Sequence, residues 1–215
     1  MRSGDFFGRQ GELEKLQILW GKRTASLVVC KGRRRIGKST LIEEFSKDAA
    51  FLEFQGLAPR DGIENQTQLE HFMEQLSQQS KFPAVKLQDW NQAFALLNTQ
   101  INSSKRTVLF IDEISWMAGK DPDFVGKLKT AWDTQLKKHP RLVVVLCGSV
   151  SSWIDKNILK NADFVGRVSL TLGLEELPLK DAVRFWGKQG KHVSSTEKFK
   201  ILGVTGGVPK YLEEI

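Results

Sequence analysis

One eight-residue stretch, Gly-Arg-Arg-Arg-Ile-Gly-Lys-Ser at residues 32–39, constrains the fold of this chain more than any other feature. It matches the pattern G-x-x-x-x-G-K-[ST] of a phosphate-binding loop at every position. The apolar, β-branched run at residues 27–30 predicts a buried strand before the loop. After the loop, Leu41, Ile42 and Phe45 share one face of an expected helix. The alternative is a basic turn that merely caps a helix, and both flanks disfavour it.

The residue types within the loop suit the binding of phosphate. Gly32 and Gly37 permit backbone angles and close approaches that a Cβ would block. Backbone N–H groups converge at a helix N-terminus, where the helix dipole favours an anion. Lys38 would add a positive charge for the β- and γ-phosphates, and Ser39 a hydroxyl for Mg²⁺. The residues expected to surround the phosphates are Gly32, Arg33, Arg34, Arg35, Ile36, Gly37, Lys38, Ser39 and Thr40.

Two acidic residues, Asp112 and Glu113, directly follow the apolar run at residues 107–111. Asp112 would hold the coordination sphere of Mg²⁺, and Glu113 would polarise the water that attacks the γ-phosphate. Kinases that use a phosphate loop and many GTPases lack a glutamate at this place, so the pair favours an ATPase that activates water. The alternative is a cap on a following helix or turn.

Ser149 and Arg167 are further catalytic candidates. Ser149 follows the apolar run at residues 142–147. If that strand lies beside the first strand, the Ser149 hydroxyl approaches the γ-phosphate or the attacking water; otherwise it caps the next helix. Arg167 stands at the entrance to the last expected strand. It could stabilise transition-state charge as an arginine finger, within the chain or from a neighbouring subunit, or could pair with a surface carboxylate.

Strand and helix patterns alternate along the 215 residues. The expected strands are residues 27–30, 50–55, 107–111, 142–147 and 168–172. Helical spacing covers residues 64–105, with a break at 81–86, and residues 124–138, after a loop that contains Gly119 and Pro122. It resumes beyond Pro178 and continues to the end. This alternation predicts an α/β fold with a mainly parallel sheet covered on both faces, together with a small helical appendage.

Composition indicates the cellular compartment of the protein but does not specify its function. The net charge of +7 permits an acidic partner such as nucleic acid, but three of the arginines lie in the phosphate loop and other positive charges are dispersed on helices. No apolar run approaches the roughly 20 residues of a membrane span, and residues 1–5 lead into no apolar signal core. Cys30 and Cys147 each end an expected buried strand, as reduced core thiols do. The sequence therefore predicts a cytoplasmic protein that does not enter the membrane.

The motifs occur in an order that resembles a known family. They are Phe7-Gly8-Arg9, the loop at 32–39, Leu109-Phe110-Ile111-Asp112-Glu113, Cys147-Gly148-Ser149, Gly166-Arg167 and Gly206-Gly207-Val208-Pro209-Lys210-Tyr211-Leu212. This set resembles the archaeal-type predicted ATPases, which are related to the AAA+ and STAND signal-transduction ATPases. The resemblance extends from Phe6 to Leu212.

For the fold, the resemblance implies a P-loop NTPase core at residues 1–177 and the beginning of a helical lid at residues 178–215. The five strands would take the order 5-1-4-3-2. Cys30 and Cys147 would then lie on adjacent strands. For the site, it implies that Gly8 and Arg9 lie near the adenine of ATP, and that Pro209 starts a lid helix that also approaches the base.

Two departures from the family pattern concern the lid. AAA+ members commonly carry a lid arginine at the position where this chain has Gly206-Gly207-Val208-Pro209, so coupling to the γ-phosphate would pass through Lys210. Such proteins also usually continue into a winged-helix domain and often a nuclease-like domain, whereas this sequence stops at Ile215. DNA is therefore a partner expected only through domains beyond this sequence, and a second copy of the chain is another.

The resulting hypothesis is an ATPase that binds ATP with Mg²⁺ and hydrolyses it slowly, as a conformational or assembly switch. One alternative is a small-molecule or nucleoside kinase with the same loop. Asp112-Glu113 and the G-G-x-P element argue against it, and no N-K-x-D guanine motif supports a GTPase. Another alternative is a nucleic-acid-binding module that nucleotide only regulates. The net charge allows such a module, but no helix-turn-helix or zinc pattern supports it.

Overall fold

The computed structural model describes residues 6–80 and 82–214, so expectations for residues 1–5, 81 and 215 lie outside the described residues. Its centre is a five-stranded sheet. The strands are β1 (Ser26–Lys31), β2 (Ala50–Gln55), β3 (Thr107–Asp112), β4 (Leu142–Gly148) and β5 (Val168–Gly173). Their order is β2-β3-β4-β1-β5, and every neighbouring pair is parallel. Read from the other edge, this is the predicted order 5-1-4-3-2, which is confirmed.

The central strands are apolar on both faces because both faces are covered. All residues of β3 and β4 are buried. Successive side chains of a strand point to opposite faces, so β1 sends Leu27 and Val29 into one hydrophobic core and Val28 and Cys30 into the other. The edge strands β2 and β5 are only partly buried. The predicted sheet covered on both faces is therefore present.

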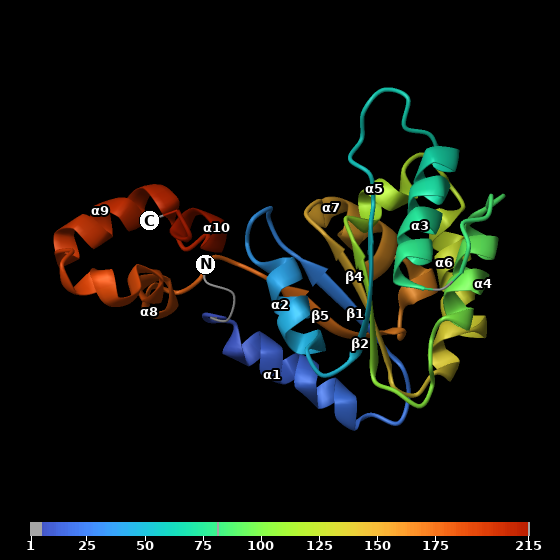
Figure 1. Cartoon of the computed structure of the whole chain (residues 1–215), viewed down its shortest axis with the longest axis horizontal. Helices are drawn as coiled ribbons and strands as arrows, with labels where there is room; N and C mark the ends of the chain where they lie inside the picture. The colour runs from blue at the N-terminus through green and yellow to red at the C-terminus, as the bar shows by residue number, and fades with distance from the viewer. Residues whose placement is uncertain (1–5, 81, 215) are drawn as a thin grey trace.

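Helices form a layer on each side of the sheet (Figure 1). One layer holds α1 (Gln10–Ile18), followed by the short η1 (Leu19–Gly21), and α2 (Lys38–Ser46). The other holds α3 (Asn65–Gln79), α4 (Trp90–Thr99) and α6 (Phe124–Thr134). The break between α3 and α4 falls where Pro83 was expected to interrupt the helical pattern. Asp89 starts α4 as an N-cap, its side chain accepting a hydrogen bond from the backbone N–H of Gln92.

The two cysteines lie side by side in the sheet, because Cys30 on β1 and Cys147 on β4 are register partners on adjacent strands. Their predicted placement on adjacent strands is confirmed. Both thiols are free and completely buried. The contact with Cys30 and burial both raise the pKa of Cys147, so the thiol form is favoured.

Some elements differ from the sequence prediction. The loop expected after Glu113 begins with a short helix, α5 (Ile114–Ala118), because Ile114, Met117 and Ala118 are buried at helical spacing. The helix expected to reach residue 138 ends at Thr134, and η2 (Leu136–Lys138) follows as a separate turn. Beyond β4, the short helix α7 (Ser151–Ile154) continues into the π-helix η3 (Asp155–Leu159), and η4 (Ala162–Phe164) precedes β5.

The chain beyond β5 forms a separate helical part at one end of the molecule (Figure 1). It comprises α8 (Leu179–Ala182), η5 (Val183–Lys191), α9 (Ser195–Thr205) and α10 (Pro209–Leu212). Leu177, Ala182 and Leu212 form its own small hydrophobic cluster. We refer to residues 178–214 as the lid; that this segment is a separate domain stays a prediction.

Within the described part of the chain, no helix combines the length and apolar character that crossing a membrane requires.

Candidate functional site

The phosphate loop connects the carboxyl end of β1 to the first turn of α2. Gly37 has φ 88° and Arg35 φ 67°, so the loop passes twice through the left-handed region of the backbone map. At Gly32 a Cβ would lie 2.5 Å from the carbonyl oxygen of Leu174. Glycine is therefore required there by close packing, and the loop leaves the N-terminal amides of α2 directed at the space above it.

That space is a cleft of about 310 Å³ between the loop, the end of β3 and the lid. It is lined by Arg34, Arg35, Gly37, Lys38, Ser39, Thr40, Asp112, Glu113, Pro209, Lys210 and Glu213. The fold thus brings together predicted site residues from the loop, the end of β3 and the lid. The sheet order does this, because the carboxyl ends of parallel strands meet at one edge.

Lys38 lies across its own loop. Its Nζ donates to the carbonyl oxygens of Gly32, at 2.8 Å, and Arg33, at 3.0 Å. The residue is buried, with only 7% of its surface exposed. A phosphate group entering the cleft would offer the Lys38 ammonium an anionic partner in place of these two neutral carbonyls.

Ser39 and Asp112 are hydrogen bonded, with 3.1 Å between Ser39 Oγ and Asp112 Oδ2. The other carboxylate oxygen of Asp112 accepts from the backbone N–H of Glu113 at 2.9 Å. A hydroxyl and a carboxylate at this distance are hard oxygen donors that fit Mg²⁺, which takes its remaining ligands from water and substrate phosphates. Among the described residues no cluster of three His, Cys, Asp or Glu side chains could hold a metal by itself. A site completed by the nucleotide is consistent with that finding.

Glu113 occupies a strained backbone conformation, with φ 46° and ψ 48°. Its Oε2 accepts two hydrogen bonds from Ser149, from the backbone N–H at 3.1 Å and from Oγ at 3.0 Å. Glu113 ends its strand beside the carboxyl end of β4, so the two residues meet across neighbouring strands. The structure therefore places Ser149 against the expected catalytic carboxylate.

The Arg9 guanidinium contacts protein groups from three segments of the chain. Its Nη2 donates to the carbonyl oxygens of Ile36, at 3.2 Å, and Glu175, and Nη1 lies 3.3 Å from Glu12. Arg9 is 8% exposed and has φ 59° at the start of α1. The guanidinium thus connects the N-terminal helix, the phosphate loop and the segment before the lid. The expected placement of Arg9 near adenine stays a prediction.

A second, smaller hollow of about 30 Å³ adjoins the phosphate loop on the lid side. It is lined mainly by aromatic and apolar groups, among them Phe7, Ile36, Phe185 and Pro209. Gly8 adjoins it and is packed tightly, since a Cβ there would lie 2.8 Å from a side-chain carbon of Leu177. The hollow has room for little more than a water molecule, so a purine would fit only if the lid moved away.

The three loop arginines each contact a protein group outside the loop. Arg33 forms an ion pair with Glu176 at 2.7 Å. Arg34 lies over the ring of Trp116 at 4.8 Å, and Arg35 lies over the ring of Tyr211 at 5.6 Å. Arg34 and Arg35 also line the cleft, whereas Arg33 does not. Local sequence spacing carries no signal for the contacts of the loop arginines with Trp116, Glu176 and Tyr211, so the sequence did not predict these contacts.

The lid meets the phosphate loop through Pro209, and Gly207 packs the lid against the segment that precedes it. A Cβ at Gly207 would lie 2.1 Å from the carbonyl oxygen of Leu177, and a Cβ at Gly37 would lie 3.6 Å from Pro209 Cγ. Lys210 lines the cleft, but its Nζ pairs with Glu213 and Glu214 on its own helix, at 3.2 and 3.3 Å. The contact with Glu213 raises the pKa of Lys210.

Arg167 lies at the other end of the sheet. It precedes β5 at the amino edge, whereas the phosphate loop follows β1 at the carboxyl edge. Its guanidinium forms a bidentate ion pair with Asp133 of α6, with distances of 3.0 and 2.8 Å. The hydrogen bonds from Arg167 hold the pKa of Asp133 far below its usual value. The structure thus shows the alternative of pairing with a carboxylate. In this arrangement the sheet separates Arg167 from the cleft, and its role as an arginine finger stays a prediction.

These features define the class of protein: an α/β P-loop NTPase in which the phosphate loop, Asp112 and Glu113 meet at one edge of the sheet. The model of the family described as an ATPase domain predominantly from Archaea matches residues 6–215. The chain belongs to this family, as the ordered motifs predicted.

Similar proteins support the same placement. An uncharacterized protein of Methanocaldococcus jannaschii is 23% identical over 210 residues, which are 98% of this chain and 44% of that protein. The chain thus spans less than half of this relative. The Walker-type ATPase of Pyrococcus abyssi matches with a TM-score of 0.70 and 19% identity, over 98% of this chain and 67% of that one. Cdc6p of Pyrobaculum aerophilum gives a TM-score of 0.60 and 13% identity, over 90% and 54%. Both solved structures share the fold.

Proposed function

We propose that this chain binds ATP with Mg²⁺ in the cleft above the phosphate loop and hydrolyses it slowly. The observation that carries the proposal is the convergence of three strand ends: Ser39 bonds Asp112, and Glu113 bonds Ser149, beside Lys38. Membership of an ATPase family supports nucleotide binding and hydrolysis as the general activity. Adenine specificity, Mg²⁺ dependence and the following roles are parts of the proposal.

The chain's own groups have distinct roles in this scheme. Lys38 leaves the carbonyl oxygens of Gly32 and Arg33 and takes the β- and γ-phosphates as partners. Ser39 and Asp112 hold Mg²⁺, which neutralises phosphate charge when bound. Glu113 orients the attacking water and accepts its proton. The strained backbone at Glu113 and its bonds to Ser149 aim the carboxylate before substrate arrives.

We propose that the nucleotide acts as a switch through the lid. The base enters beside Phe7, Gly8 and Pro209, where the present space is too small for it, so binding displaces the lid. Arg34 and Arg35 line the cleft above the phosphate loop. Arg34 contacts Trp116 and Arg35 contacts Tyr211, so these arginines would transmit the presence of phosphate to α5 and to α10. The switch therefore converts occupancy of the cleft into lid position.

Arg167 fits this scheme only in an assembly of identical chains. It lies on the surface at the amino edge of the sheet, where it could reach the cleft of a neighbouring copy and stabilise transition-state charge. It would have to exchange Asp133 for the γ-phosphate. DNA remains a proposed partner only through domains beyond this sequence. The reduced, buried thiols Cys30 and Cys147 support the cytoplasmic setting that we propose.

The test is nucleotide binding and turnover by the wild-type chain and by two variants of the cleft. Glu113→Gln should retain ATP affinity and lose turnover by roughly 10²–10⁴-fold, because the variant cannot accept the proton. Lys38→Ala should lose ATP affinity by about a hundredfold, or roughly 2.7 kcal/mol. Lys47→Ala, which removes a lysine at the far end of the same helix, is the matched control and should change neither quantity.

Three outcomes would contradict the proposal. They are full affinity in Lys38→Ala, a strong preference for GTP, or transfer of phosphate to a small-molecule acceptor. The last would favour the kinase interpretation. Removal of Mg²⁺ with a chelator should abolish turnover, which is measured as released phosphate.

A further inference from the structure

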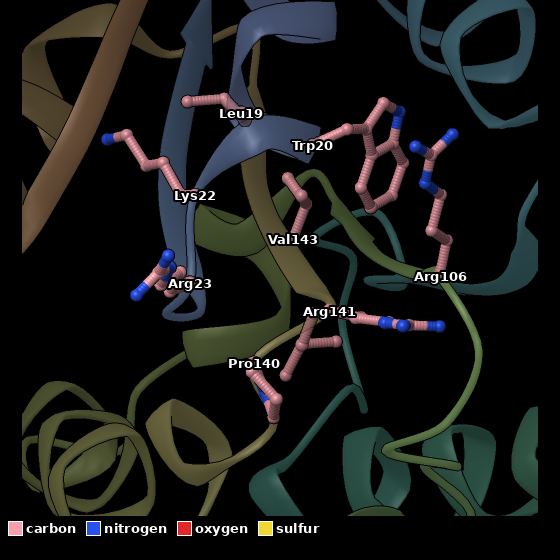
Figure 2. Close-up of a pocket in the computed structure, with 9 residues that line it drawn as sticks. Leu19, Trp20, Lys22, Arg23, Arg106, Pro140, Arg141 and Val143 are labelled. Atoms are coloured by element: carbon pink, nitrogen blue, oxygen red, sulfur yellow. The ribbon is translucent and has the colours of Figure 1, made fainter.

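A separate hollow of about 450 Å³ lies at the amino end of the sheet, at the opposite end of β1 from the phosphate loop. Its floor is apolar and includes Leu19 and Val143, and Trp20 forms part of one wall. Figure 2 shows Lys22 and Arg23 on one side of this space and Arg106 and Arg141 on the other. Four positively charged side chains thus surround one cavity.

The sheet order creates this cluster. Arg106 directly precedes β3 and Arg141 directly precedes β4, while Lys22 and Arg23 lie in the turn before β1. These three strands are neighbours and run in the same direction. Cations separated by more than a hundred residues in sequence therefore gather at one edge, and no local motif signals it.

The cations of the hollow lack acidic partners. Within residues 6–80 and 82–214, none of the four forms an ion pair, and no carboxylate lines the cavity. Arg141 donates to the carbonyl oxygen of Ser104 at 2.7 Å, and Arg106 lies 5.4 Å from the centre of the Trp20 ring. Both contacts hold a guanidinium in place without neutralising it. In the cleft, by contrast, Lys210 has two carboxylate partners.

We propose that this hollow binds a ligand with two or more phosphate groups. Guanidinium groups bind phosphate oxygens in a bidentate manner, and three arginines with one lysine match several phosphates at once. An anion would also reduce the repulsion among four like charges that line one cavity. Leu19, Trp20 and Val143 offer an apolar surface for the carbon skeleton that carries the phosphates. Two sources share this chemistry: the backbone of a single-stranded nucleic acid and a soluble oligophosphate.

The proposed site is distinct from the nucleotide cleft. β1 is six residues long, which at roughly 3.3 Å per residue separates the two ends by roughly 20 Å. A phosphate group bound in the hollow therefore does not occupy the phosphate loop, so its binding does not require that ATP be displaced. The inference is consequently independent of the proposed hydrolysis.

The experiment uses the full 215-residue chain carrying Lys38→Ala, so that the cleft contributes little to phosphate binding. Two probes are compared at low salt: a fluorescein-labelled oligothymidylate, followed by anisotropy, and inorganic tripolyphosphate, followed by calorimetry. Arg106→Glu combined with Arg141→Glu reverses two charges of the hollow. Lys156→Glu combined with Lys160→Glu is the matched control, because it makes the same change in net charge at exposed residues elsewhere.

We expect the arginine pair to weaken probe binding at least tenfold and the lysine pair to leave it within about twofold. For the oligonucleotide, loss of two phosphate contacts should also reduce the slope of log affinity against log salt by roughly 1.4. Binding of both probes identifies a nucleic-acid backbone as an accepted ligand, and binding of tripolyphosphate alone identifies a soluble oligophosphate.

The proposal would be overturned if neither probe bound, or if the lysine pair caused an equal loss of binding. Unfolding is monitored by circular dichroism. If the charge-reversed variant does not fold, Arg106→Gln with Arg141→Gln replaces it and must show the same selective loss.

Discussion

At the carboxyl end of the sheet, charged groups are matched to partners and the backbone is strained, whereas at the amino end most cations are exposed and the backbone is relaxed. Among the residues that the structure describes, the non-glycine residues with positive φ are Arg9, Arg35 and Glu113, and all three belong to the nucleotide end. Two side-chain hydrogen bonds lie at that end, one between Ser39 and Asp112 and the other between Ser149 and Glu113. At the amino end, the four cations around the hollow form no ion pair within the described residues: Lys22, Arg23, Arg106 and Arg141.

The difference shows two ways in which one sheet presents charge. Preorganised groups suit a reaction, because little needs to move as charge develops. Exposed, unpaired cations suit binding, since an anion neutralises them without breaking protein contacts. Arg167 differs from the cations of the hollow: it also lies at the amino end of the sheet, but it forms an ion pair with Asp133.

The largest effect on stability is expected from Gly207→Ala, which tests how tightly the nucleotide end is packed. The added Cβ would lie 2.1 Å from the carbonyl oxygen of Leu177. We expect a loss of roughly 1–3 kcal/mol in lid stability and faster hydrogen exchange across α9 and α10. Gly203→Ala, where no atom lies within 4 Å, is the control and should stabilise α9 by up to about 1 kcal/mol. Equal exchange rates in both variants would refute tight packing of the lid.

An intermediate effect is expected from Ser149→Ala, which removes one of the two hydrogen bonds that Glu113 receives from this residue. The backbone N–H of residue 149 remains as a donor at 3.1 Å. ATP turnover should therefore fall about tenfold, or roughly 1.4 kcal/mol, while ATP affinity is unchanged. Ser152→Ala, at an exposed residue of α7, is the control. Faster turnover in Ser149→Ala would mean that Ser149 restrains Glu113 rather than aims it.

The smallest effect is expected from Asp133→Asn, which disrupts the ion pair of the amino end. Arg167 lowers the pKa of Asp133 below its unfolded value of about 4, so the pair stabilises the fold fully above that pH. The stability difference between wild type and variant should be small and constant from pH 5 to 8. It should shrink as the pH falls below about 4, because Asp133 then becomes protonated in the unfolded chain. Urea denaturation measures this difference, and a gap that persists unchanged at pH 3 contradicts the assignment.

Much of the fold was predictable because its signals are local. Apolar runs marked all five strands, and helical spacing marked the longer helices. The strand order was predicted through a family resemblance, since strand periodicity contains no information about neighbours. The helix α5 was missed because five residues after Glu113 are too few for a recognisable periodicity. In the candidate site, residue types predicted the loop and the two acids, but the side-chain partners of Arg9 and Arg167 were not predictable.

The sequence by itself determined that this chain has a phosphate loop between a buried strand and a helix, with an acidic pair at the end of another strand. These features depend on residues close together in the chain, so their chemistry is visible in the order of amino acids. Only the tertiary structure decided which distant groups meet: Glu113 with Ser149, Arg167 with Asp133, and the four cations around the second hollow. The physical reason is that parallel strands are joined by long crossovers, so neighbours in space are far apart in sequence.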